Sequence, residues 1–170
     1  MRHAHHVVAL GLLAALPLTG CVVPPAPGVP MPARSGVLQA DARALRFGAS
    51  GPEIFANPEM RGRLQALFGA DWNRGRLAFG APDYFPAASS LRLVRVVDQD
   101  FVAVSGCVAS ACPTHRGLLL IRQDGQHLLA RLDEGGYSHY YEHAPGASVA
   151  SVPRPVIDGA WDAVSGLMQK

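Results

Sequence analysis

The sequence is poor in cysteine and in charge of either sign. Only 3 of its 170 residues are cysteine, which excludes a small scaffold held together by several disulfides. Its 15 Lys and Arg residues nearly balance 13 Asp and Glu, so nothing predicts a basic surface for nucleic acid. A hydrophobic fraction of 49 % argues against a disordered chain. We therefore expect one globular domain and no nucleic-acid partner.

Familiar catalytic signatures are also missing. The sequence has no Gly-x-Ser-x-Gly elbow, no His-Glu-x-x-His motif and no Gly-rich phosphate loop. Ser105 or Ser110 with His115 would supply a nucleophile and a base, but no orienting acid is evident. His139 and His143 leave a metal site open as an alternative. We expect a protein that is not an enzyme and needs no metal or cofactor.

The N-terminus has the pattern of an export signal. Arg2 precedes an apolar run over residues 7–18, which is shorter than the ~20 residues that span a bilayer. The sequence Leu18-Thr19-Gly20-Cys21 resembles a bacterial lipobox, which implies a lipoprotein signal peptide over residues 1–20 and acylation of Cys21. The acyl chains would hold the protein on a lipid bilayer. The alternative is an ordinary signal peptide followed by a free thiol.

A proline-rich segment follows Cys21. Residues 22–35 contain five prolines and no apolar periodicity, which predicts an extended spacer of roughly 40 Å. Residues 21–36 would thus form a lipidated tether. By analogy with the sorting rule of Gram-negative lipoproteins, Val22 after the cysteine favours the outer membrane, facing the periplasm.

Residues 37–170 have the patterns of an α+β domain. The Ser50–Glu53 capping box and Asn57-Pro58 are two possible starts for one helix, most securely over residues 58–68. A second helix is expected near the C-terminus, with Asp158 as its cap. Between the helices, alternating apolar runs and turn residues predict an antiparallel sheet of about five strands, over residues 91–97, 101–105, 118–122, 127–132 and 137–142. The run 118–121 is continuously apolar, which is typical of a central strand.

Cys107 and Cys112 lie between two of these strands. If Cys21 is lipidated, they form an even pair in an oxidising compartment, and the spacing of four residues permits a compact closed loop. Zinc sites usually require a second Cys or Cys/His pair, and thioredoxin-type redox motifs have two intervening residues. We therefore predict a disulfide.

This Cys-x4-Cys loop between strands resembles that of the Ivy-type inhibitors of vertebrate lysozyme. The resemblance covers mainly residues 90–132 and implies a loop that projects into the active-site cleft of lysozyme. The family loop reads Cys-Lys-Pro-His-Asp-Cys, whereas Val108, Ser110 and Ala111 stand here at its Lys, His and acidic positions. Residues that remain able to contact a partner from the loop and its flank are Ser110, Thr114, His115 and Arg116.

These features predict a membrane-anchored periplasmic binding lipoprotein that acts through a disulfide-braced loop, with a lysozyme-like muramidase as protein partner. The alternative is a structural or assembly lipoprotein of the cell envelope. In that case the tyrosines at 137, 140 and 141 would form a recognition surface on the strand over residues 137–143.

Overall fold

The computed structural model describes residues 36–39, 41–96, 98–146 and 154–168. All of them belong to one compact unit, Met31–Lys170. The expected signal peptide, Cys21 and the tether up to residue 35 lie outside the described residues.

The first helical segment contains two short helices where the sequence predicted one. Helix α1 (Gly51–Ala56) begins after Ser50, whose hydroxyl accepts a hydrogen bond from the Glu53 backbone N–H. Helix α2 (Pro58–Phe68) begins after Asn57, whose side chain caps the Glu59 N–H. Since Pro58 cannot donate a backbone hydrogen bond, the chain ends one helix and starts the next at this point. Each of the two possible helix starts in the sequence therefore begins a helix of its own.

Six antiparallel strands form one sheet, so the α+β class is confirmed and the expected strand count is one too low. The strands follow one another in chain order, and each pairs with the next. The strand that was not predicted is β1, which has only two residues. The strands are β1 (Gly36–Val37), β2 (Ser90–Val96), β3 (Gln99–Cys107), β4 (His115–Arg122), β5 (Leu128–Glu134) and β6 (Tyr137–His143).

The turn between β2 and β3 is tighter than predicted. Gln99 and Asp100 were expected in the loop, but both belong to β3, where they pair with Val96 and Arg95. Asp98 takes the positive φ of 61° that such a tight turn requires. The turn between β5 and β6 uses two glycines with positive φ, Gly135 and Gly136.

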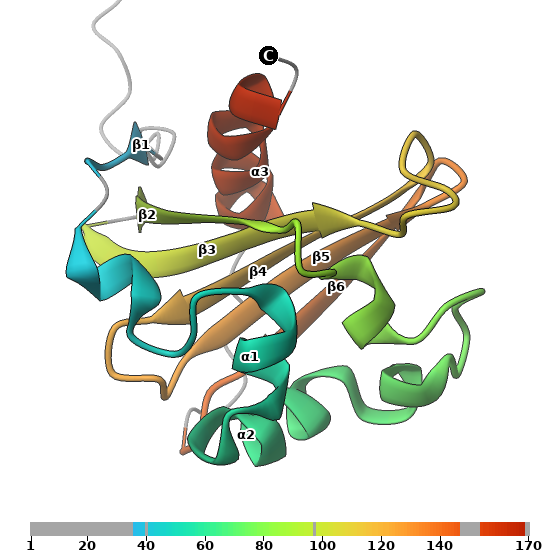
Figure 1. The fold of residues 1–170 in the computed structure, drawn as a ribbon, viewed down its shortest axis with the longest axis horizontal. Coiled ribbons are helices and arrows are strands. Elements are labelled where there is room, and N and C mark those ends of the chain that lie inside the picture. The colour runs from blue at the N-terminus through green and yellow to red at the C-terminus, as the bar shows by residue number, and fades with distance from the viewer. Residues whose placement is uncertain (1–35, 40, 97, 147–153, 169–170) are drawn as a thin grey trace, which may run out of the picture. The chain divides into compact units, whose positions relative to one another are not determined.

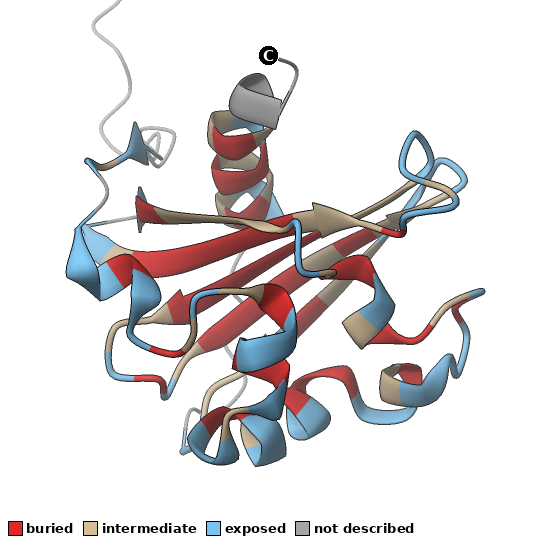
Figure 2. Cartoon of the chain, in the orientation of Figure 1, coloured by how far each residue is buried: buried red, intermediate tan, exposed pale blue. Residues whose placement is uncertain are grey.

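Helices cover both faces of the sheet (Figure 1). On one face α1, α2 and the short 3-10 segments η1 (Ala42–Leu45), η2 (Gly69–Asn73) and η3 (Ala81–Tyr84) pack on a core that includes Leu119 and Ile121. On the other face α3 (Arg154–Met168) packs on a second core that includes Leu118 and Leu120. Strand β4 is thus buried on both faces, as its continuous apolar run predicts (Figure 2).

Asp158 does not cap α3, which already begins at Arg154. Its carboxylate instead accepts hydrogen bonds from the Arg131 guanidinium at 2.9 Å and the Tyr140 hydroxyl at 2.7 Å. The Arg131 guanidinium also lies 4.3 Å from the centre of the Trp161 ring. These contacts hold α3 against β5 and β6. Within the described ranges, no helix has the length and apolarity needed to cross a membrane.

Candidate binding site at the disulfide loop

Cys107 and Cys112 form the predicted disulfide, with their Cα atoms 4.9 Å apart. Cys107 ends β3, and Cys112 lies in the loop that leads to β4. The bond closes a small ring at the end of the sheet, beside the turn between β5 and β6 (Figure 1). The chain that links these two central strands is therefore covalently held where it leaves the sheet.

Hydrogen bonds fix the rest of this loop. The Ala111 carbonyl accepts from the backbone N–H groups of Thr114 at 3.0 Å and His115 at 2.8 Å, and from the Thr114 hydroxyl at 3.2 Å. The Thr114 carbonyl in turn accepts from the Gly135 N–H at 3.1 Å, which connects the loop to the β5–β6 turn. Val108 is only 5 % exposed and packs into the core. Hydrogen bonds and the buried Val108 side chain therefore order the loop, in addition to the disulfide.

The outer residues of the loop are exposed to solvent (Figure 2). Two of the four predicted contact residues, Ser110 and Thr114, are among them. The whole exposed set is Ala109, Ser110, Cys112, Pro113 and Thr114. This surface is small, weakly polar and free of acidic side chains.

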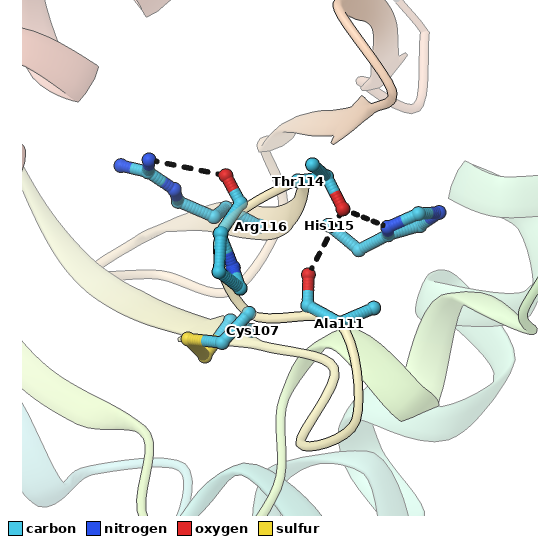
Figure 3. The surroundings of a disulfide bond; sticks show 7 residues. Cys107, Ala111, Thr114, His115 and Arg116 are labelled. Atoms are coloured by element: carbon cyan, nitrogen blue, oxygen red, sulfur yellow. Dashed lines mark hydrogen bonds between the residues drawn. A yellow bond between two sulfur atoms is a disulfide. The ribbon is translucent and has the colours of Figure 1, made fainter.

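The other two predicted contact residues, His115 and Arg116, point in opposite directions (Figure 3). They are consecutive in β4, and successive side chains of a strand point to opposite faces of the sheet. The structure therefore separates the predicted set of four into two exposed loop residues and one residue on each face.

His115 lies on the face covered by α1 and α2. Its ring is 5.3 Å from the ring of Phe79, edge to face, and its Nδ1 is 2.9 Å from the Thr114 hydroxyl. Its Nε2 is 3.7 Å from Glu134, a carboxylate that also accepts a hydrogen bond from the Ala78 N–H at 2.8 Å. With 16 % of its side chain exposed, His115 mainly joins the loop to the surrounding segments.

Tyr84 lies beside His115, with the two ring centres 6.3 Å apart. Burial, with the nearby charges of Glu134 and Asp83, raises the pKa of Tyr84 to about 12. Its hydroxyl has no hydrogen-bond partner among the described residues.

His139 also approaches Glu134, at 3.9 Å, but the described residues contain no group of three side chains suited to hold a metal ion. The Thr114–His115–Glu134 arrangement thus braces the loop.

Arg116 lies on the α3 face of the sheet, where it pairs with Cys107 across β3 and β4. Its guanidinium donates to the Pro113 carbonyl at 3.3 Å, and within the described part of the chain it makes no ion pair. It borders a hollow of about 490 Å³ together with Ser105 and the disulfide. It also borders a second hollow of about 280 Å³, whose wall includes Trp161. Arg116 is therefore a cation available to a ligand.

The tyrosines of β6 do not form one recognition surface. Tyr137 is 77 % exposed, whereas Tyr141 is 8 % exposed and donates its hydroxyl proton to Asp71 at 3.0 Å. Tyr140 points to the α3 side, where it bonds Asp158. Two of the three predicted contact tyrosines are thus occupied in holding the domain together.

Comparison with protein-family profiles, with curated proteins and with solved structures gives no match to this chain. The candidate site therefore rests on the residues and geometry described above.

Sequence reasoning considered Ser105 only as a nucleophile without an orienting acid, and it did not place Glu134 at this site. Ser105 is the single polar side chain in a run of buried positions of β3, from Phe101 to Ser105, and that contrast was a readable signal. Glu134 reaches His115 because the two residues pair directly across β4 and β5. That proximity depends on strand register, which the sequence did not specify to the residue.

Proposed function

We propose that this protein is a membrane-anchored binding protein of the bacterial cell envelope whose disulfide loop inserts into the active-site cleft of a lysozyme-like muramidase. The observation that carries the proposal is the exposed loop at 109–114, which is braced by a disulfide and by hydrogen bonds. A loop that is already ordered loses little conformational entropy on binding, so more of its contact energy appears as affinity. The loop acts by obstruction, and the protein itself catalyses no reaction.

The charge of the loop supports this partner. Residues 107–117 contain no carboxylate, and their charged or titratable side chains are His115 and Arg116. Muramidases of the lysozyme type carry two catalytic carboxyl groups in their cleft. A loop without acidic groups avoids like-charge repulsion there, and the hydroxyls of Ser110 and Thr114 can donate hydrogen bonds.

The proposed anchor is the acylated Cys21, in the outer membrane facing the periplasm. The support comes from Leu18-Thr19-Gly20-Cys21 and from the proline-rich residues that follow. The same oxidising compartment would preserve the Cys107–Cys112 disulfide. The mass of the mature N-terminus tests this part: a diacylglyceryl cysteine at position 21 is expected, and an unmodified cysteine there would contradict it.

The partner is tested by placing one negative charge on the exposed surface of the loop. Ala109→Glu would face the carboxyl groups of the cleft, so inhibition of a responsive muramidase should fall by at least about tenfold. Ala66→Glu makes the same change on an exposed position of α2 and should leave inhibition unchanged. A panel of muramidases that the wild-type chain neither binds nor inhibits would overturn the proposal.

The alternative role, in envelope assembly through β6, has less support in the geometry. Tyr140 and Tyr141 are engaged with Asp158 and Asp71, which leaves Tyr137 as the exposed tyrosine of the strand. If an envelope component co-purifies with the protein and Tyr137→Ala releases it while Ala109→Glu does not, the assembly role replaces the inhibitor role.

A further inference from the structure

A hollow of about 490 Å³ lies beside the disulfide, at the end of the sheet where β3 extends beyond β2. Ser90 and Ser105 form the last pair between these strands, and the next two residues of β3 pair with β4 alone. The segment leading into β2 forms one side of the hollow, and the disulfide and Pro113 form the other. The volume suits a small organic molecule or the end of a peptide.

Two serines that border this hollow have hydroxyls without a hydrogen-bond partner in the described part of the chain. Ser105 is 2 % exposed, and its Oγ has no hydrogen-bond partner among the described residues. The same holds for the buried Oγ of Ser89. An unpaired buried hydroxyl carries a desolvation cost, which a ligand can remove by supplying a donor or an acceptor.

The Ser89 hydroxyl lies on the side of β3 opposite to Ser105, because it approaches the Cβ position of Gly106 and adjacent strand residues face opposite sides. A Cβ atom at Gly106 would lie 2.5 Å from Ser89 Oγ and 2.6 Å from the Tyr84 carbonyl oxygen. Any side chain at position 106 would therefore displace the segment that carries Ser89. The glycine allows that segment to lie directly on β3.

Arg116 contributes the charge of the site. Cys107, Ser105 and Arg116 lie on one face of the sheet, because Cys107 pairs with Arg116 and Ser105 is two residues before Cys107 on the same strand. The guanidinium makes no ion pair within the described ranges, and the carboxylate of Asp133, which lies opposite Arg116 across β4 and β5, is bonded to Arg131 and Ser138. Free guanidinium groups bind carboxylates with two parallel hydrogen bonds.

Most of the surface that lines the hollow is apolar and includes Pro86, Ala88, Pro113 and the disulfide. We propose that it binds an N-acylated apolar amino acid, either as a free molecule or as the C-terminal residue of a peptide. The carboxylate pairs with Arg116, the apolar side chain packs on the prolines and the disulfide, and the amide bonds the Ser105 hydroxyl. The Ser105 hydroxyl disfavours a plain acyl chain, which would leave it unpaired. This inference does not depend on the muramidase partner.

The test is a titration of the isotope-labelled full chain, with its disulfide intact, followed by NMR. N-acetylleucine should shift the backbone amide signals of residues near 86–90, 105–107 and 112–116. N-acetylleucinamide, which lacks the carboxylate, should bind at least about tenfold more weakly. A tripeptide with a free C-terminal leucine distinguishes the two sources, because it binds more tightly than N-acetylleucine only if a peptide end is the natural ligand.

Two variants examine the roles of the side chains. Arg116→Gln should weaken N-acetylleucine binding to the level of the neutral amide, while Arg61→Gln, the same change at an exposed position of α2, should have no effect. Ser105→Ala should weaken binding of both ligands. Equal binding of the acid and the amide, shifts confined to other parts of the protein, or no shifts at millimolar ligand would each overturn the proposal.

Discussion

The Tyr141 hydroxyl donates a hydrogen bond to Asp71 Oδ2 at 3.0 Å, joining β6 to a segment 70 residues earlier in the chain. Asp71 is 1 % exposed and also accepts two hydrogen bonds from Arg76, one from the backbone N–H and one from the guanidinium, both at 2.7 Å. Burial alone would raise the pKa of Asp71, but these hydrogen bonds outweigh it and hold the pKa below its ordinary value. A buried carboxylate therefore fastens the segment after α2 to the edge of the sheet.

This carboxylate should make stability depend on pH. Because the pKa of Asp71 is lower in the folded than in the unfolded chain, its contribution is complete above the unfolded value of about 3.9 and is lost as the pH falls through the folded value. Asp71→Asn should thus cost about 1–3 kcal/mol near neutral pH, and less in acid. Urea unfolding of the variant and of wild type, near neutral pH and in acid, measures this cost. Asp162→Asn, at an exposed position of α3, is the control; equal costs at both pH values would contradict the account.

Removing the Tyr141 hydroxyl should destabilise the protein by about 1 kcal/mol, because Asp71 then loses one hydrogen bond but keeps those from Arg76. Thermal or urea unfolding of Tyr141→Phe measures the loss. Tyr137→Phe, on the same strand but 77 % exposed, should change stability by less than about 0.5 kcal/mol. Equal losses of stability in the two variants would contradict the stabilising role of the Tyr141 hydrogen bond to Asp71.

Loss of the disulfide should affect binding more than folding. In the chain-entropy relation, a ring closed between residues five apart stabilises the folded state by only about 2 kcal/mol. Cys107→Ser with Cys112→Ser should therefore leave a folded domain with a less rigid loop. The double variant and reduced wild-type protein should give the same unfolding curve and the same affinity for the muramidase. Unchanged affinity would show that the brace has no role in binding.

Ser105→Ala should leave the protein as stable as wild type or up to about 1 kcal/mol more stable, because it removes a buried hydroxyl that has no partner among the described residues. Urea unfolding is the measurement, with Ser110→Ala at an exposed position as control. A clear loss of stability would mean that the hydroxyl is already satisfied in the folded protein, and would weaken the argument for a ligand.

Local patterns predicted much of the fold. Helix α2 begins and ends where the sequence indicated, because Asn57-Pro58 and Gly69 are strong start and stop signals. Strand β4 was recognised as central from its continuous apolar run. Strand β1 was missed because two residues show no periodicity, and the role of Asp158 was missed because it depends on Arg131 from a distant strand.

The candidate site was predicted only in part. The pairing of Cys107 with Cys112 follows from the cysteine count and spacing. The separation of His115 and Arg116 could also have been read from the sequence, since adjacent strand residues alternate between faces. The hollow beside Arg116 could not, because it arises where β3 extends past β2, and that depends on the register of distant segments.

The most direct test of the central claim is a competition experiment at the cleft of the muramidase. The wild-type full chain is titrated against a muramidase that it binds, with and without a saturating oligosaccharide that fills the cleft. If the loop at 109–114 occupies that cleft, the apparent affinity should fall in proportion to the saccharide occupancy. Unchanged affinity in the presence of the saccharide would contradict the account.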